Sequence, residues 1–436
     1  MARNIVHMAL PMTVAQLINI LYNVVDRMYL GRLPGHLALT GLGLCLPIIS
    51  ILMAFANLCG MGGAPLCSIH LGRGENGEAE RIIGNSFALL LLFGAGLTVL
   101  CLAFRRPILY LFGASDVTFP YANDYLTIYV LGTVFVMIGL GMNPFINSQG
   151  FSGMGMLTVA LGAVVNIVLD PIFIFLLGMG VRGAALATVI SQACSAVWVL
   201  CFLTGRRVIL RLRPAALRLR WARVRRILAL GASGFAMSMT NSLVQVLCNA
   251  SLQVYGGDLY VGVMTVINSV REVVSMPVQG ITNGCQPVLG YNYGAGEYGR
   301  VREGIRFTTV LTVGYSLAAW ALVMAVPELL IRIFNSEADL IAAGIPAFRI
   351  YFAAFFCMSF QFIGQSVFVG LGRSKNAVFF SMLRKAFIVA PLTLLLPALG
   401  MGVNGVFLAE PISNVLGGLA CILTMYATVY RPLGRQ

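Results

Sequence analysis

Long apolar stretches recur along the whole chain, each about as long as a helix needs to be to cross a bilayer, and short polar connections separate them. A spanning helix takes about 20 consecutive apolar residues, whereas the strands of a membrane barrel alternate between apolar and polar positions. These stretches do not alternate, so we predict an all-α integral membrane protein with twelve transmembrane helices. The predicted spans are residues 4–25, 38–69, 82–104, 125–149, 154–178, 183–205, 227–255, 259–288, 307–327, 340–372, 376–398 and 403–430.

The second half of the chain repeats the first. The sequence GMGVRG at 178–183 returns as GMGVNG at 400–405, which is 222 residues later, and an apolar run with the same Leu-Ala and Ile-Ser pairs follows each copy. Glycines extend the match at nearly the same spacing: Gly74 pairs with Gly294, and Gly150 pairs with Gly370. Each copy therefore holds six helices. Because six is an even number, both copies cross the bilayer in the same sense.

We expect this duplication to define the domains. Residues 1–205 form a predicted N-lobe and residues 227–436 a predicted C-lobe. Residues 206–226 carry nine arginines and form a predicted basic cytoplasmic linker between the lobes.

Composition and charge narrow the class of protein. Hydrophobic residues make up 59% of the chain and charged residues only 10%, with a mean hydropathy of +0.88, which excludes a soluble globular protein. The basic residues concentrate at the termini and in alternate connections, and this asymmetry predicts a multi-pass protein of a bacterial-type inner membrane with both termini in the cytoplasm. The arginine cluster contains one aromatic residue, Trp221, so it fits anionic lipid headgroups better than a nucleic acid.

The sequence offers no catalytic constellation. The only lysines are Lys375 and Lys385, and because neither follows a glycine there is no phosphate-binding loop of the nucleotide triphosphatases. The three histidines lie near predicted helix ends without a paired nucleophile, and the ten cysteines lack metal-ligand spacing. We therefore expect no enzyme activity and no cofactor. The expected partners are small molecules and the lipid bilayer, with the chain acting as a monomer.

Ionisable residues inside predicted spans need an explanation, because each costs on the order of 2.5 to 3.5 kcal/mol to insert. Asp26, Asp170 and Thr188 come from three helices and lie at one depth, roughly 7 to 12 Å below the outer surface by helical rise. Asn166 is one turn from Asp170, and Tyr22 shares a helix face with Asp26. Such a group can hold a proton or coordinate a hard cation such as Na⁺, so we predict a cation- or proton-coupling site. The alternative is that Asp26 only reaches water from near a helix end.

The second half has a different polar inventory. Its first helix carries an amide every four residues, which forms one continuous polar stripe. A stripe of this kind either holds helices together or lines a watery cavity, and we favour a cavity for the solute. Glu410 aligns with Thr188 at the repeat spacing, so an acid stands on a different helix in this half. The predicted substrate-cavity residues are Asn241, Gln245, Asn249, Gln253, Arg271, Glu272, Gln361 and Glu410.

Two segments carry a family resemblance that extends over essentially the whole chain. Residues 23–33 (NVVDRMYLGRL) resemble the end of the first helix of multidrug and toxic compound extrusion (MATE) transporters, and residues 286–295 (QPVLGYNYGA) resemble their eighth-helix signature. The resemblance implies two six-helix lobes arranged as a V, which export hydrophobic, cationic drugs by alternating access in exchange for H⁺ or Na⁺.

The resemblance also implies roles for particular residues. Asp26, Asn166, Asp170 and Thr188 match the family's N-lobe cation site, and Pro11 matches a proline at which the first helix bends. The chain departs from members that carry a second acidic site in the C-lobe, because Gln245 and Gln361 occupy those regions.

The sequence leaves one alternative function open. A flippase for lipid-linked saccharides belongs to the same wider superfamily. It would use Arg271, Arg384 and Lys385 to hold phosphates.

Overall fold

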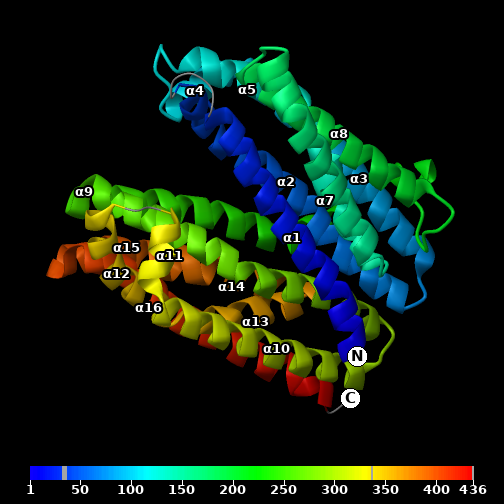
Figure 1. The fold of residues 1–436 in the computed structure, drawn as a ribbon. Coiled ribbons are helices and arrows are strands. Elements are labelled where there is room, and N and C mark those ends of the chain that lie inside the picture. The colour runs from blue at the N-terminus through cyan, green and yellow to red at the C-terminus, as the bar shows by residue number, and fades with distance from the viewer. Residues whose placement is uncertain (32–36, 335–336, 435–436) are drawn as a thin grey trace. The chain divides into compact units, whose positions relative to one another are not determined.

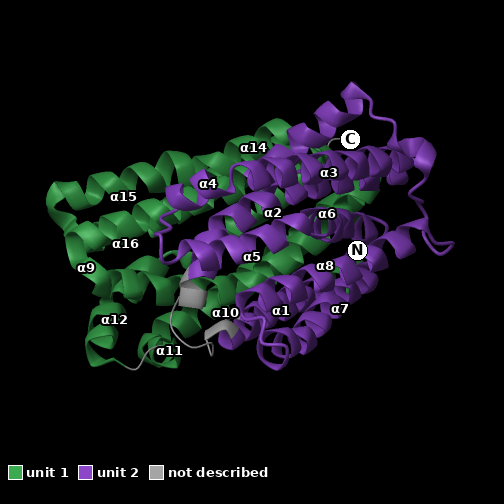
Figure 2. Cartoon of the chain, turned by 90° about the horizontal axis from the view of Figure 1, so that it is seen from above, with its two compact units in different colours: residues 1–9, 236–436 green, residues 10–235 purple. Residues whose placement is uncertain are grey.

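The structure is a computed structural model that describes residues 1–31, 37–334 and 337–434. The described residues are almost entirely helical and contain no strand, as the apolar pattern predicts (Figure 1). The chain folds into two compact units, which Figure 2 distinguishes by colour. The N-terminal unit consists of residues 10–235, and the C-terminal unit of residues 1–9 and 236–436.

The helices of the N-terminal unit follow one another with short connections, and one of them, α1, begins in the other unit. They are α1 (Ala2–Gly31), α2 (Leu37–Gly72), α3 (Asn76–Ala103), α4 (Arg105–Leu111), α5 (Phe119–Leu131), α6 (Thr133–Ser148), α7 (Ser152–Pro171), the π-helix η1 (Ile172–Leu176), α8 (Val181–Thr204) and the 3₁₀-helix η2 (Pro214–Leu217).

The C-terminal unit has the same alternation of long helices and short turns, and its first helix, α9, begins in the N-terminal unit. Its helices are α9 (Trp221–Gly294), α10 (Tyr298–Ala325), α11 (Pro327–Phe334), α12 (Ala338–Phe352), η3 (Phe355–Cys357), α13 (Met358–Gly370), α14 (Ser374–Met382), η4 (Leu383–Val389), α15 (Ala390–Leu396), η5 (Pro397–Met401), α16 (Gly402–Met425), η6 (Tyr426–Tyr430) and η7 (Pro432–Gly434).

The described helices account for twelve membrane crossings. Eight helical stretches are long and apolar enough to span a bilayer, and two bent pairs, α5 with α6 at 57° and α12 with α13 at 41°, pass the same test as one span each. Two of the eight stretches are long enough to hold two spans each, and each contains a break. The 74-residue α9 breaks at Gly257, where φ is 69°, and the stretch 374–434 breaks at Gly400, where φ is 95°.

The glycine turns show that the duplication is a repeat of backbone conformation. Positive φ angles, which glycine adopts at little cost, recur at a constant interval of 222 residues in four pairs. The sequence pairing of Gly74 with Gly294 and of Gly150 with Gly370 is therefore wrong by two residues, because the second copy has glycines at both 294 and 296 and at both 370 and 372. The pairs are Gly74 with Gly296, Gly150 with Gly372, Gly178 with Gly400, and Gly180 with Gly402.

The predicted linker folds onto the N-terminal unit. The Asn85 side chain on α3 donates hydrogen bonds to the carbonyl oxygens of Ala216 and Arg218, each at 3.1 Å. Further on, the Arg223 guanidinium makes two bonds of 2.7 and 2.8 Å to the Glu78 carboxylate. Two-point contact between a guanidinium and a carboxylate fixes direction as well as distance. Residues 206–226 therefore lie within the compact unit that ends at Phe235.

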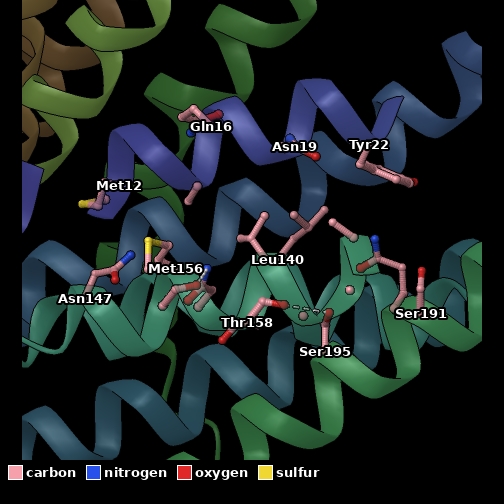
Figure 3. A pocket seen from close by; sticks show the side chains of 18 residues that line it. Met12, Gln16, Asn19, Tyr22, Leu140, Asn147, Met156, Thr158, Ser191 and Ser195 are labelled. Atoms are coloured by element: carbon pink, nitrogen blue, oxygen red, sulfur yellow. Dashed lines mark hydrogen bonds between the residues drawn. The ribbon is translucent and has the colours of Figure 1, made fainter. Parts of the chain in front are cut away.

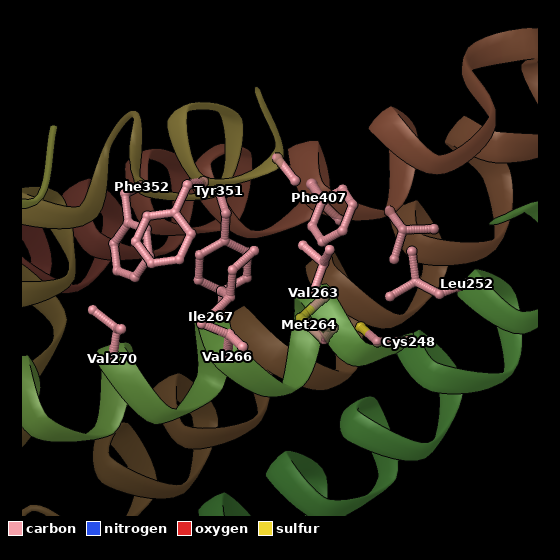
Figure 4. Close-up of a cluster of buried hydrophobic side chains, with 14 of the residues drawn as sticks. Cys248, Leu252, Val263, Met264, Val266, Ile267, Val270, Tyr351, Phe352 and Phe407 are labelled. Carbon is pink, nitrogen blue, oxygen red and sulfur yellow. The ribbon is translucent and has the colours of Figure 1, made fainter. Parts of the chain in front are cut away.

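The core of the C-terminal unit gathers large apolar side chains from α9, α12 and α16 (Figure 4). Ile267 from α9 and Phe352 from α12 are fully buried there, together with Phe407 from α16. Burial of such side chains, each worth about 1.5 to 3 kcal/mol in a soluble protein, has less driving force in lipid. Close packing of helices must therefore supply more of the stability.

Small residues let helices approach closely in the N-terminal unit. A Cβ atom added at Gly62 on α2 would lie 2.1 Å from the Ile227 carbonyl oxygen on α9, whereas one added at Gly43 on the same helix would meet nothing within 4 Å. We therefore expect Gly62→Ala to lower the free energy of unfolding by about 1 to 3 kcal/mol through overpacking. Gly43→Ala should leave it unchanged or raise it by up to about 1 kcal/mol through helix propensity.

Thermal unfolding of the two detergent-purified variants checks this contrast. Equal melting temperatures for both variants would show that α2 and α9 do not approach as closely as described.

Candidate functional site

A buried polar cluster joins α1, α7 and α8 in the N-terminal unit. Asp170 and Asn166 are fully buried, Thr188 is 4% exposed and Asp26 is 8% exposed. The Asn166 side-chain nitrogen donates to Asp170 Oδ1 at 3.5 Å and to Thr188 Oγ1 at 3.4 Å. Asp26 and Asp170 interact electrostatically. The structure therefore brings together the four residues that the sequence analysis assigned to a coupling site.

Local structure explains how the cluster forms. Helix α7 ends at Pro171, and the π-helix η1 and the glycine turn lead into α8, which begins at Val181. A Cβ added at Gly183 would lie 2.7 Å from the backbone of Phe173, so only glycine allows α8 to pack against the chain after α7. This close approach sets Thr188 beside Asn166.

Three tyrosines surround the acidic pair. Tyr22 on α1 interacts with Asp26 and Thr188, and Tyr125 on α5 interacts with the same two residues. Tyr125 and Tyr129 are each 3% exposed, and their rings stack with centroids 6.0 Å apart. Tyr22 was predicted from the sequence, whereas Tyr125 and Tyr129 were not. Their four-residue spacing, which puts both on one helix face, was the available signal.

Two buried oxygens in the cluster have no partner among the residues that the structure describes. They are the second carboxylate oxygen of Asp170 and the amide oxygen of Asn166. An unsatisfied buried acceptor costs about 1 to 3 kcal/mol, so such atoms in a native site need an explanation.

A cavity of about 180 Å³ lies beside the cluster in the N-terminal unit (Figure 3). It is larger than an engineered cavity of about 150 Å³ that admits benzene. Its walls carry methionine, amide and hydroxyl side chains and no charged group among the described residues. Tyr22 belongs both to this wall and to the acidic cluster. The residues labelled in Figure 3 are Met12, Gln16, Asn19, Tyr22, Leu140, Asn147, Met156, Thr158, Ser191 and Ser195.

A second ionic cluster lies in the C-terminal unit. Glu410 on α16 is 5% exposed and accepts hydrogen bonds from Arg384 at 2.9 Å and from Lys385 at 3.0 and 2.9 Å. Arg384 also donates to Asn414 Oδ1 at 2.6 Å. Both basic residues lie in η4, and π-helical turns of this kind occur often at functional sites.

The structure brings only some of the predicted substrate-cavity residues together. Asn241, Gln245, Arg271 and Glu410 line one small cavity in the C-terminal unit.

The other four predicted cavity residues have different surroundings. Gln253 donates to Asp258 at 2.9 Å near the break in α9, and Gln361 donates to the Phe380 carbonyl at 2.7 Å, which ties α13 to α14. Glu272 is exposed and Asn249 is half-buried.

Pro11, the predicted hinge, lies inside α1 just after the boundary between the two compact units. Proline removes one backbone hydrogen bond from a helix interior and favours bending there.

Polar cavities and buried ionisable groups inside a duplicated bundle of spanning helices define a multi-pass membrane transporter. The chain belongs to the MatE family, whose model matches it twice, over residues 11–172 and 234–395. These two matches confirm the internal duplication.

Named relatives agree with this assignment. The multidrug export protein MepA of Staphylococcus haemolyticus is 23% identical over 421 residues, which cover 97% of this chain and 92% of that protein. A solved outward-facing multidrug resistance MATE transporter has the same fold, with a TM-score of 0.93 and 22% identity over 100% of this chain and 97% of the other. A MATE structure in complex with MaL6 matches with a TM-score of 0.94 and 22% identity, at the same coverage. The resemblance to MATE transporters and the predicted fold are confirmed.

Removal of the buried carboxylate should destabilise the C-terminal unit. Glu410→Ala leaves Arg384 and Lys385 buried without an anion. We therefore expect the free energy of unfolding to fall by about 3 to 5 kcal/mol. The neighbouring acid Glu272 is exposed, so Glu272→Ala should change it by less than about 0.5 kcal/mol. Thermal unfolding of purified protein distinguishes the two, and a Glu410→Ala variant as stable as wild type would contradict the ion cluster.

Proposed function

We propose that the protein is a secondary active multidrug efflux transporter, which exports hydrophobic, cationic compounds in exchange for H⁺ or Na⁺. The names of the MepA relatives support multidrug export. The observation that carries the coupling is a pair of oxygens on Asp170 and Asn166 that have no partner among the described residues, next to a second carboxylate on Asp26.

A cation would satisfy this arrangement. Two carboxylates that face each other in a low-dielectric site repel strongly, and a proton or a Na⁺ ion between them removes the repulsion. Either ion would also take up the free oxygens of Asp170 and Asn166, and Na⁺ would find a further oxygen on Thr188. Carboxylate, amide and hydroxyl oxygens can bind either ion, so the site's chemistry fits both H⁺ and Na⁺.

Helix α1 offers a route from the ion to the drug. Met12, Gln16, Asn19 and Tyr22 line the cavity at three- and four-residue spacing, and Asp26 follows on the same face. Ion binding at Asp26 would change how this face packs, with Pro11 as the hinge. Export then requires that ion and drug favour different conformations. The neutral, methionine-containing wall suits varied apolar solutes.

The cellular setting follows from the charge pattern. We propose that both termini lie in the cytoplasm, that the protein resides in a bacterial-type inner membrane, and that it works as a monomer without an organic cofactor or enzyme activity. The arginines of residues 206–226 support the orientation by the excess of basic residues on the cytoplasmic side.

The flippase alternative has weaker support. It needs Arg271, Arg384 and Lys385 to hold phosphates, yet Arg384 and Lys385 are both bonded to Glu410. The cavity that Arg271 and Lys385 line measures about 30 Å³, which leaves no room for a phosphorylated saccharide. These contacts favour drug export.

Ethidium efflux from cells that express the protein tests the coupling site. We expect Asp26→Asn and Asp170→Asn each to abolish gradient-dependent efflux, because the proposed ion site needs both carboxylates. Expression of both variants should stay at the wild-type level. Asp116→Asn is the matched control, because Asp116 is an exposed aspartate of the same unit that accepts a bond from Tyr110.

Separate collapse of the Na⁺ and H⁺ gradients in the wild type names the coupling ion. Full efflux by both aspartate variants would refute the coupling site. Wild-type cells that export no cationic dye under any gradient would redirect the proposal to the flippase.

A further inference from the structure

The repeat puts two buried polar clusters at corresponding places in the two units. At the constant interval of 222 residues, members of the acidic cluster correspond to residues of the C-terminal unit that also lie together: Tyr351 and Cys248 both interact electrostatically with Glu410. Tyr129 and Tyr351 are buried, and so are Thr188 on α8 and Glu410 on α16. The corresponding pairs are Thr188 with Glu410, Tyr129 with Tyr351, and Asp26 with Cys248.

The two clusters carry opposite charge. The N-terminal cluster holds Asp26 and Asp170. The corresponding place in the C-terminal unit holds three basic side chains around the single carboxylate of Glu410, and the basic residues are Arg271, Arg384 and Lys385. Three positive charges against one negative charge leave this cluster with two positive charges in excess.

Glu410 forms its close ion pairs with two of the three basic groups, Arg384 and Lys385. Its two oxygens already accept one bond from Arg384 and two from Lys385. In the described part of the chain no carboxylate lies within 4.0 Å of the Arg271 guanidinium, which instead interacts with the Tyr351 phenol. Glu272 is the neighbouring acid, but its side chain is exposed.

A cavity lies where the excess charge is. It measures about 30 Å³, and its wall includes Arg271, Lys385, Tyr351 and Glu410 as well as the amide side chains of Asn241, Gln245 and Asn268. A water needs at least about 10 to 15 Å³ by this measure, so the space holds one or two waters or one small ion. Arg271 is half-buried, so its charge is partly removed from water, and an anion in this cavity would recover part of the cost of that desolvation.

We propose that this cavity is an anion-binding site for one small monovalent anion, either chloride or the carboxylate group of a solute. The Arg271 guanidinium is the principal donor, Lys385 adds charge, and the amides complete the shell. The site does not depend on the proposed ion-coupled export.

Thermal unfolding of the purified full-length protein tests the site in detergent at constant ionic strength. Sodium MES, whose bulky sulfonate does not fit the cavity, is replaced stepwise by sodium chloride or by sodium acetate. The wild type should show a saturable rise in melting temperature with at least one of the two small anions, because a ligand that binds only the folded state stabilises it. Arg271→Gln should shift half-saturation at least tenfold upward. Arg332→Gln is the matched control, because it removes an exposed arginine of the same unit, and it should behave like the wild type.

Glu410→Gln keeps the test decisive if Arg271→Gln fails to fold. This substitution raises the excess from two to three positive charges, so the variant should have a lower melting temperature than the wild type in MES. The small anion should raise its melting temperature by more than it does in the wild type, and half-saturation should occur at a lower anion concentration. A merely structural glutamate predicts the same loss of stability in every anion.

The outcomes distinguish an inorganic anion from a solute carboxylate, and both from the absence of an anion site. Stabilisation by chloride alone identifies an inorganic anion, and stabilisation by acetate identifies a site for a solute carboxylate. Equal melting temperatures in all three salts, or an unaltered anion dependence in both Arg271→Gln and Glu410→Gln, would overturn the proposal. No gradient or transport enters this measurement, so loss of the coupling site at Asp26 and Asp170 would leave its result unchanged.

Discussion

The cost of charge inside a membrane protein governs this structure. An ionisable group within the spanning helices needs a partner or a polar cavity, because lipid supplies neither water nor counter-ions. Glu410 has its partners in Arg384 and Lys385, with contacts near 2.9 Å. Asp26 and Asp170 bring two acidic groups together, and Arg271 has no carboxylate partner within 4.0 Å in the described part of the chain. These are the two places where we propose a coupling ion and an anion.

Glycine makes these clusters possible through close approach and through turns. Gly183 lets α8 pack against the chain that follows α7, and Gly405, one repeat later, packs against the backbone of Leu396 and Pro397. The same backbone conformation at Gly180 and Gly402 starts α8 and α16 in the same way. Thr188 and Glu410 thus reach corresponding positions because the scaffold repeats, while the side chains differ.

Much of the fold and half of the site could be predicted from the sequence, for identifiable reasons. Apolar spans and a long repeat are strong signals, and carboxylates in apolar helices are conspicuous, so Asp26 and Asp170 could be found. Tyr125 was missed because a tyrosine in an apolar helix looks like ordinary core. Gln361 resembles a cavity residue in sequence but bonds to the Phe380 carbonyl, close to where α14 gives way to a π-helix, and that change of helical pitch leaves no trace in composition.

Helix α1 belongs to both compact units, with residues 2–9 in one and residues 10–31 in the other. At its start, Ala9 lies so close to Gly284 that an added Cβ there would approach the Ala9 Cα to 2.6 Å. Asp26 is 17 residues further along, or about 25 Å by helical rise. The short N-terminal part of this helix thus packs in one unit, and its longer C-terminal part carries Asp26 in the other. A small rotation at the proposed hinge, Pro11, would be magnified into a displacement of several ångströms at Asp26, and the position of this one proline would then set how far the proposed ion could move the wall of the cavity.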